Sequence, residues 1–233
     1  VDSAAAYVKA ILESDASGHD WEHIKRVYRN AMMLLDGEKG EALIVALCAL
    51  LHDVDDWKLS GRTPEDAQSL PRVHGFFDKY AADNPVLRTA VCDAIRASGF
   101  KESLKGGGSL SAEAKILHDA DKLDAIGAIG IARCFAFGGH KGRPFFLSDV
   151  FPDSDITYEK YTDHTRDENT AINHFFDKLL TLKDRMKTKA GQAEAVKRHE
   201  FLVTYLQHFF KEQNEQRWLD YLANYLDKAA PGG

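Results

Sequence analysis

The chain has 233 residues, of which 44% are hydrophobic and 28% are charged, so it is long enough to bury a substantial core as one domain. The formal net charge of -6 argues against general binding to nucleic acids or anionic membranes, because both need a clustered basic surface. No uncharged apolar run of about 18 residues is present, so we expect no transmembrane helix.

The cysteines and the N-terminus indicate the compartment. Cys48, Cys92 and Cys134 stand singly in apolar surroundings, without a CxxC spacing. An odd number of such residues predicts reduced thiols packed in the core rather than a disulfide framework. The first twenty residues have no basic segment followed by an apolar one, so they do not predict a signal peptide. We therefore expect a cytoplasmic protein.

The first two predicted helices carry a candidate functional histidine. Residues 4–12 have apolar side chains at helical spacing, and Asp20 is a predicted N-cap for the next helix. That second helix has an apolar stripe formed by Ile24, Val27, Ala31, Leu34 and Leu35. His23 lies in the first turn, at the edge of the stripe. It is therefore expected to face the protein interior.

Residues 42–58, ALIVALCALLHDVDDWK, form an apolar helix that ends in the pair His52 and Asp53. Such a hydrophobic segment belongs inside the fold, where an unpaired imidazole or carboxylate is costly. A metal ion is one partner that would satisfy both groups. Because consecutive helical residues diverge by about 100°, both side chains reach one ion only near a helix end.

Further helices are predicted downstream. Thr63 is a predicted N-cap with Pro64 at the first helical position, and another helix restarts at Pro71. A helix follows Asn84-Pro85, and the glycine-rich residues 98–109 predict a flexible connection. Ser111 then caps a helix that is expected to run to residue 137 and to close at two glycines.

The helix that starts at Ser111 contains the acidic segment HDADKLD. Asp121 and Asp124 are three residues apart and therefore lie on one face, whereas Asp119 is turned away from Asp121 by about 200°. Only one or two of these three carboxylates can face the same ion. Asp121 is the candidate ligand.

The last third of the chain contains an irregular segment and more helices. Residues 138–163 show no regular pattern and are predicted to form a substrate loop or lid. Residues 164–182 and 191–226 have amphipathic helical patterns. No strand-like alternation is present, so we predict an all-α helical bundle and a single domain overall. Its expected parts are a metal-binding core at 1–137, the loop at 138–163 and C-terminal helices at 164–233 packed on the core.

His23, His52, Asp53 and Asp121 together form the candidate metal site. Two imidazoles and two carboxylates suit Mn, Fe, Co, Ni or Zn, and they leave places on a six-coordinate ion for water and a phosphate oxygen. Each residue alone is more often a helix cap, a surface charge or a hydrogen-bonded core group. The combination predicts a hydrolase that uses a metal-activated water.

Five segments of the chain resemble a known family. GHDWEHIKRV, ALLHDVDDWK and DADKLDAIGAIGIAR are similar to the signature segments of the HD-domain metal-dependent phosphohydrolases. GGHKGRP and TAINHFFDKLLTLKDRM resemble its small stand-alone bacterial YedJ/YpgQ-like branch. The resemblance implies an all-helical HD fold with metal ligation by His23, His52, Asp53 and Asp121. It also implies manganese-dependent hydrolysis of deoxynucleoside triphosphates to monophosphate and pyrophosphate, with Mg2+, Fe2+, Co2+, Ni2+ or Zn2+ as alternative ions.

Other residues are candidates for catalysis or substrate binding. Asp56 is a candidate general base, and Lys58 is a candidate to neutralise phosphate charge. The cations proposed to grip a triphosphate are Lys101, Lys105, Lys141 and Arg143. Lys58 can equally be a solvated loop lysine, and each of the other four cations taken alone is more often an ordinary surface charge. His19 and Asp20 are candidates to orient His23.

The expected ligand is a small nucleotide or another phosphorylated molecule, with no nucleic-acid polymer and no membrane as partner. A homodimer is left open by the amphipathic C-terminal helices. The alternatives to a pyrophosphohydrolase are a nucleotidase or phosphomonoesterase, and a non-catalytic metal-containing module that senses nucleotides. A purely structural metal site is a further alternative, and it would have a closed coordination shell.

Overall fold

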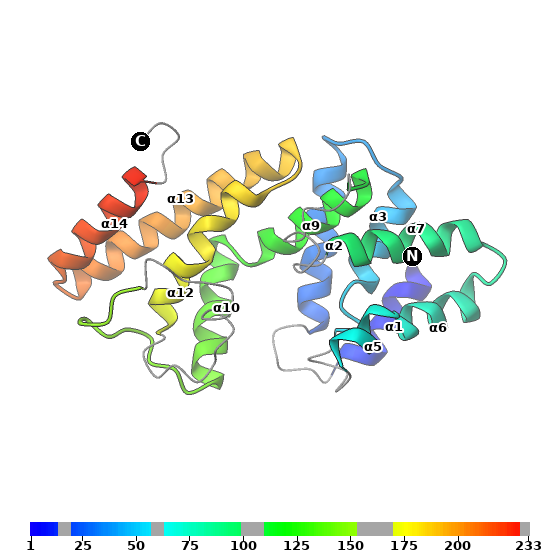
Figure 1. Ribbon diagram of the computed structural model, residues 1–233, viewed down its shortest axis with the longest axis horizontal. Coiled ribbons are helices and arrows are strands. Elements are labelled where there is room, and N and C mark those ends of the chain that lie inside the picture. The colour runs from blue at the N-terminus through cyan, green and yellow to red at the C-terminus, as the bar shows by residue number, and fades with distance from the viewer. Residues whose placement is uncertain (14–19, 57–62, 99–109, 153–169, 229–233) are drawn as a thin grey trace. The chain divides into compact units, whose positions relative to one another are not determined.

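The computed structural model describes residues 1–13, 20–56, 63–98, 110–152 and 170–228. Their regular secondary structure consists of helices without a strand, which confirms the predicted all-α class (Figure 1). None of the described helices combines the length and apolar character that a membrane span requires. The contacts divide the chain into two units. The predicted single-domain organisation and its boundaries stay a prediction.

Unit 1 comprises Val1–Asp124 together with Arg185–Glu194. Its helices are α1 (Asp2–Leu12), α2 (Trp21–Leu35), α3 (Ala42–Leu51), α5 (Pro64–Gln68), α6 (Pro71–Tyr80), α7 (Pro85–Ser98) and α9 (Ala112–Asp124). Helices α2, α3 and α9 pack against one another, and α7 contacts both α3 and α9. Helix α3 is buried around its whole circumference from Val45 to Leu51, which explains why its sequence lacks a polar face.

The predicted helix starts in unit 1 are confirmed. The Asp20 carboxylate accepts a hydrogen bond of 2.8 Å from the backbone N–H of His23. Thr63 Oγ1 accepts from the N–H of Asp66 at 3.1 Å, and Ser111 Oγ accepts from that of Ala114 at 3.1 Å. Each cap satisfies a backbone donor that has no partner within the helix.

The prediction of one helix from Ser111 to residue 137 is wrong. Helix α9 ends at Asp124, and α10 (Gly127–His140) begins after a two-residue break and continues through both of the glycines expected to close it. Gly127 has φ +75°, a left-handed conformation that glycine adopts without strain. A Cβ atom at Gly127 would also lie 3.2 Å from Cβ of Arg198. Glycine therefore fits both the backbone and the available space.

Unit 2 comprises Ala125–Asp184 and Ala195–Gly233. Its described elements are α10, α12 (Ala171–Asp177), most of the 3-10 helix Leu179–Arg185, the larger part of α13 (Lys189–Glu212) and α14 (Gln216–Lys228). Helix α13 therefore begins in unit 1 and continues in unit 2. Its separation from α14 occurs at Asn214, which has φ +56°.

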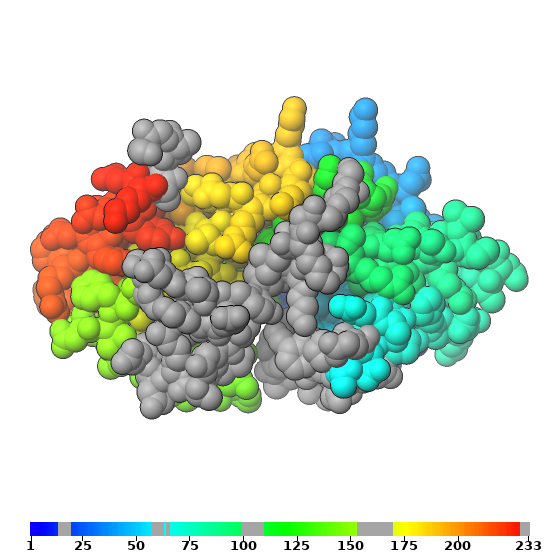
Figure 2. Space-filling view, viewed as in Figure 1, coloured from blue at the N-terminus to red at the C-terminus, as the bar shows by residue number. Residues whose placement is uncertain are grey.

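The described part of the predicted loop at 138–163 packs on aromatic side chains of unit 2. Residues 138–140 belong to α10, and residues 141–152 are irregular. Phe146 contacts Phe210 and Trp218, and the Trp218 indole donates a hydrogen bond of 2.8 Å to the carbonyl of Ser148. Figure 2 shows α14 in red beside this yellow-green segment at the surface. Residues 153–163 lie outside the described part of the chain.

Candidate metal centre

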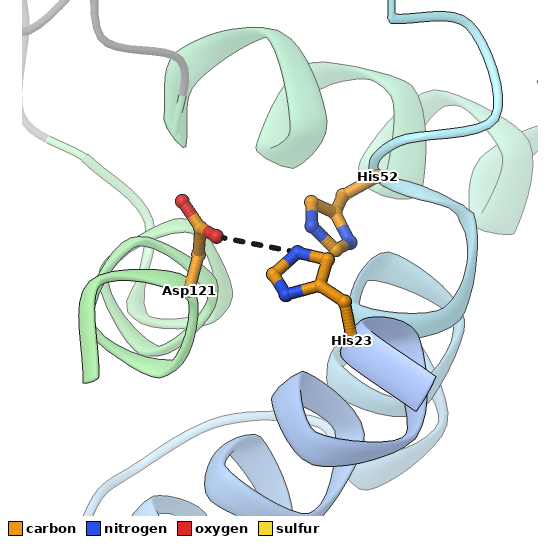
Figure 3. Close-up of side chains that lie close together, drawn as sticks. All are labelled: His23, His52 and Asp121. Carbon is orange, nitrogen blue, oxygen red and sulfur yellow. Dashed lines mark ion pairs between the residues drawn. The ribbon is translucent and has the colours of Figure 1, made fainter. Parts of the chain in front are cut away.

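Three helices of unit 1 bring His23, His52 and Asp121 together (Figure 3). His23 lies in the first turn of α2, His52 follows the last residue of α3, and Asp121 lies near the end of α9. Each offers one possible ligand atom, and these atoms all lie within 4.8 Å of one another. Nε2 of His23 is 3.6 Å from Oδ1 of Asp121. These three side chains could therefore bind a metal ion.

Asp53, the fourth predicted ligand, lies beside both imidazoles. Its Oδ2 atom is 3.3 Å from Nε2 of His23, and its Oδ1 atom is 3.4 Å from Nε2 of His52. Its position beyond the end of α3 is the one that was expected to let neighbouring residues converge. The structure thus places all four predicted ligands in one cluster, although metal ligation by them stays a prediction.

The orientation of His52 fits a metal ligand. Its Nδ1 atom is 3.0 Å from the carbonyl oxygen of Ala49, which can only accept, so Nδ1 carries the proton. In the neutral ring the lone pair is then on Nε2. This Nε2 atom is buried and makes no hydrogen bond within the described part of the chain. A bound cation would satisfy it.

The ring of His23 is held by a carboxylate on the side that faces away from the cluster. Nδ1 of His23 lies 2.7 Å from Oδ2 of Asp124, which is the last residue of α9. Arg26 donates from Nε to Oδ1 of Asp124 at 2.6 Å and from Nη2 to Oδ2 at 3.1 Å. As predicted, Asp124 lies on the same side of α9 as Asp121, but it contacts the back of the histidine ring.

The cluster concentrates negative charge around the imidazoles. Burial lowers the pKa of His23, but hydrogen bonds to Asp124 and Asp53 and the charges of Asp53 and Asp121 raise it to about 9. The Asp121 side chain is 47% exposed, but desolvation of its carboxylate by the surrounding protein still raises the pKa. The nearby charges of His52 and His23 outweigh this effect and leave the pKa below its ordinary value. Such a site attracts a cation, and a metal ion competes with the proton for Nε2.

Asp55 has a positional role that sequence reasoning missed. Its buried carboxylate accepts hydrogen bonds from the backbone N–H groups of Arg72 at 2.9 Å and Val73 at 3.0 Å, in the first turn of α6. The Arg72 guanidinium donates to the carbonyl of Val54 at 2.8 Å. These bonds attach the turn that carries Asp53 to α6. Pro71 opens α6, and the residue before it, Leu70, has no side chain that can cap the helix. This was a sequence signal that the first backbone N–H groups of α6 need an acceptor from elsewhere in the chain.

The structure describes only some of the remaining candidates for catalysis and substrate binding. The backbone N–H of Asp56 donates to the carbonyl of Asp53 at 3.0 Å, and the proposed role of Asp56 as a base stays a prediction. Lys141 and Arg143 belong to unit 2. Nζ of Lys141 and Cζ of Arg143 each lie 5.8 Å from the centre of the Phe137 ring. Their predicted role in substrate binding also stays a prediction. The candidates outside the described residues are His19, Lys58, Lys101 and Lys105.

Asp20 was a candidate to orient the His23 ring. Its carboxylate instead caps the backbone of His23, as described above, while the ring is held by Asp124. The sequence placed Asp20 near His23 correctly, because the two are close in the chain. It could not reveal Asp124, which is 101 residues away in the sequence.

Comparisons with known proteins agree with this geometry. Residues 20–126, which include all four predicted ligands, match the HD domain family. The chain is 35% identical over 209 residues to YpgQ of Bacillus subtilis (strain 168), an alignment that covers 88% of this chain and 90% of YpgQ.

Solved structures show the same architecture. One is an HD-superfamily hydrolase from Bacillus thuringiensis, with 36% identity, a TM-score of 0.68 and coverage of 92% of this chain and 97% of that protein. Another is YpgQ of Bacillus subtilis in complex with ADP, with a TM-score of 0.64, 30% identity in the structural alignment and coverage of 91% and 96%. The chain therefore belongs to the HD-domain family, among the stand-alone bacterial proteins that include YpgQ.

Proposed function

We propose that the protein is a metal-dependent phosphohydrolase that acts on a nucleotide and hydrolyses (deoxy)nucleoside triphosphates to the monophosphate and pyrophosphate. The observation that carries this proposal is the cluster of His23, His52 and Asp121, whose possible ligand atoms lie within 4.8 Å of one another. Membership of the HD-domain family supports hydrolase chemistry. The ADP bound to YpgQ supports a nucleotide as ligand.

In this proposal the imidazole Nε2 atoms of His23 and His52 and the carboxylates of Asp53 and Asp121 hold one divalent ion. The donor set suits several transition metals, and we propose manganese. When bound, such an ion supplies Lewis-acid activation of a phosphoryl oxygen and of water. The two carboxylates balance its charge and leave the neutral imidazoles as the remaining donors.

The exposure of the ligands favours an open metal site over a closed structural one. The His23 side chain is only 1% exposed, whereas that of Asp121 is 47% exposed. The cluster is therefore buried on the side of α2 and open on the side of Asp121. Closed structural sites use all their coordination positions for protein ligands, while catalytic sites keep a position for water or substrate. The exposure of Asp121 supports the second arrangement.

The proposal assigns the other candidates to substrate contacts. Asp56 would accept the proton of the attacking water, and Lys58 would neutralise phosphate charge. Lys101, Lys105, Lys141 and Arg143 would bind the remaining phosphate oxygens. These assignments rest on the sequence. They can be tested separately from the metal ligands by charge-removing substitutions that leave metal affinity unchanged. Substitutions of the lysines and of Arg143 are expected to raise KM for the nucleotide, and Asp56→Asn is expected to lower kcat.

A product assay in labelled water tests the reaction. Protein loaded with Mn2+ is given a panel of ribo- and deoxyribonucleoside triphosphates in 18O water, and the products are resolved by anion-exchange chromatography and mass spectrometry. We expect equal amounts of monophosphate and pyrophosphate, with 18O in the monophosphate, because attack at the α-phosphorus leaves the new oxygen there. Chelator-treated protein is the control and should show no turnover.

Other products would support a different function. Inorganic phosphate without pyrophosphate would indicate a nucleotidase or phosphomonoesterase. Binding of nucleotides without hydrolysis, tested with each of Mn2+, Mg2+, Fe2+, Co2+, Ni2+ and Zn2+, would indicate a nucleotide-sensing module. Label in the pyrophosphate would move the attack to the β-phosphorus.

A further inference from the structure

We infer that Asp124, held in place by Arg26, is a positioning residue for the metal site, because it selects the form of His23 that presents the Nε2 lone pair to a divalent ion. The inference rests on the proposed metal ligation by His23. It assigns a function to a carboxylate that contacts Nδ1 of His23, the ring nitrogen that is not proposed to bind the ion.

The contact with Asp124 determines which ring nitrogen of neutral His23 carries the proton. Oδ2 of Asp124 lies 2.7 Å from Nδ1 of His23, and an ionised carboxylate only accepts hydrogen bonds. Nδ1 is therefore the donor, and the lone pair of the neutral ring is on Nε2. The opposite tautomer would direct its Nδ1 lone pair at the carboxylate and be disfavoured. Nε2 faces Oδ2 of Asp53 at 3.3 Å and Oδ1 of Asp121 at 3.6 Å, where the ion is proposed to bind.

The carboxylate of Asp124 is itself held in place by Arg26. Arg26 donates to both oxygens of Asp124, at 2.6 and 3.1 Å, and this two-point contact restrains rotation of the carboxylate. His23 and Arg26 are three residues apart on α2, so their side chains lie on the same face of the helix and both reach Asp124 on α9. The Asp124 side chain is 2% exposed, and water is therefore a weak competitor for these bonds.

A positioning role for Asp124 differs from that of a structural ion pair between α2 and α9 in what its loss affects. A structural pair would affect the stability of the protein but not the affinity of the folded protein for metal. Unit 1 contains a matched carboxylate in Asp119, which is also on α9, completely buried and bonded to a histidine. Asp119 bonds to the ring of His118 and to Lys187 and Thr188, whereas the ring of His23 bonds to Asp124. It provides the control.

The experiment measures metal affinity of chelator-treated protein by calorimetry with Mn2+ and by the visible absorption of Co2+. Circular dichroism first identifies a temperature at which wild type, Asp124→Asn, Arg26→Lys and Asp119→Asn are all folded. We expect Asp124→Asn to raise Kd by about 10-fold to 100-fold, which is the usual effect of removing a partner that orients a ligating histidine. Asp119→Asn should leave Kd within about twofold of wild type.

Arg26→Lys keeps the positive charge but loses the planar two-point contact. It should raise Kd by at least about twofold, and by less than Asp124→Asn does. This variant decides the question if Asp124→Asn fails to fold. A ring 15N NMR spectrum of metal-free protein, recorded at a pH above the His23 pKa of about 9 so that the ring is neutral, gives an independent readout. Wild-type His23 should then show a protonated Nδ1, and Asp124→Asn should remove this preference.

The outcomes separate this inference from the proposed function. If wild type binds Mn2+ or Co2+ and Asp124→Asn and Arg26→Lys bind it equally tightly, the inference is overturned and the metal site stands. An equal loss of affinity in Asp119→Asn would also overturn it, because the effect would then be general. If wild type binds neither ion, the proposed metal site fails, and the positioning role fails with it.

Discussion

His23 and His118, two buried histidines of unit 1, each place Nδ1 against a carboxylate of α9. Nδ1 of His23 is 2.7 Å from Asp124, and Nδ1 of His118 is 2.8 Å from Asp119. All four side chains are at most 2% exposed. The bond within each pair therefore has the same chemistry, nearly the same length and similar burial.

The two pairs differ in what surrounds them. The ring of His23 has the carboxylates of Asp53 and Asp121 at its Nε2 edge. Asp119 instead accepts from the backbone N–H groups of Lys187 and Thr188 and from Oγ1 of Thr188. These bonds attach α9 to the start of α13. The comparison teaches that a buried histidine–aspartate pair does not define a site, because the neighbours of the ring and of the carboxylate decide its role.

Replacing a histidine of the candidate metal cluster and replacing the histidine bonded to Asp119 should have different consequences. His52→Ala removes a proposed ligand, so we expect Mn2+ affinity to fall by more than the roughly 100-fold that loss of an orienting partner can cause. His118→Ala should leave the affinity of the folded protein unchanged and lower its stability. Calorimetric titration with Mn2+ measures the metal affinity of both variants, and urea denaturation measures their stability. Equal metal binding by His52→Ala and wild type would contradict the proposed ligation by His52.

Asp119→Asn tests the structural side of the comparison. The substitution places an amide where a carboxylate accepts from several donors, so some of these donors lose their acceptor. We expect the free energy of unfolding to fall by about 2 to 3 kcal/mol. Urea denaturation followed by circular dichroism gives the value. A change below the error of that measurement would show that the bonds to Lys187 and Thr188 contribute little to stability.

Gly191→Ala adds a methyl group beside Asp119. Its Cβ would overlap Oδ2 of Asp119 and lie 2.7 Å from Oγ1 of Thr188, so we expect a loss of about 1 to 2 kcal/mol in the free energy of unfolding. Gly139→Ala is the matched control, because a Cβ there would have no atom within 4 Å. The control should be neutral or stabilise the protein by up to about 1 kcal/mol. Similar losses in both variants would contradict the steric argument.

His174 extends the comparison to a histidine with positively charged neighbours. Burial and the charges of Lys178 and Arg143 lower its pKa to about 3. Between pH 6.5 and 3 the unfolded chain binds a proton that the folded protein does not, so stability should fall as the pH decreases from 6.5. The slope from this group is at most about 1.4 kcal/mol per pH unit.

The measurement is a set of urea denaturation curves between pH 5 and 7.5 for wild type and His174→Gln. The substitution removes the titrating group, so the pH dependence of the free energy of unfolding should be shallower in the variant. Parallel pH profiles would contradict the lowered pKa. The thermal stability of the variant at pH 7.5 serves as the control for general damage.

The parts of the fold that depend on nearby residues could be predicted from the sequence. The all-α class followed from apolar periodicity, and the caps at Asp20, Thr63 and Ser111 each bond to a group three residues away. The inward-facing positions of His23 and His52 followed from their places at the ends of apolar helices, whereas their convergence with Asp53 and Asp121 was implied by the family resemblance. These signals are local, and tertiary packing agreed with them.

The parts that depend on distant residues could not be predicted. The partners of Asp55 and Asp119 lie 17 and 68 residues away, and no periodicity indicates such pairings. The break after α9 was missed because Ala125, Ile126 and Gly127 stand in a pattern that is otherwise helical. The left-handed backbone of Gly127 and the nearby Arg198 side chain are visible only in the folded chain.

The pairing of Asp119 with Thr188 has a consequence for biosynthesis. A ribosome releases the whole of α9 well before it releases Thr188, because the two residues are 69 positions apart. During that interval the Oδ2 atom of Asp119, which accepts from Thr188 in the folded protein, must remain hydrated or use another partner. A nascent chain arrested before residue 185 should therefore be sensitive to protease around α9, and protection should arise only after the start of α13 has left the exit tunnel.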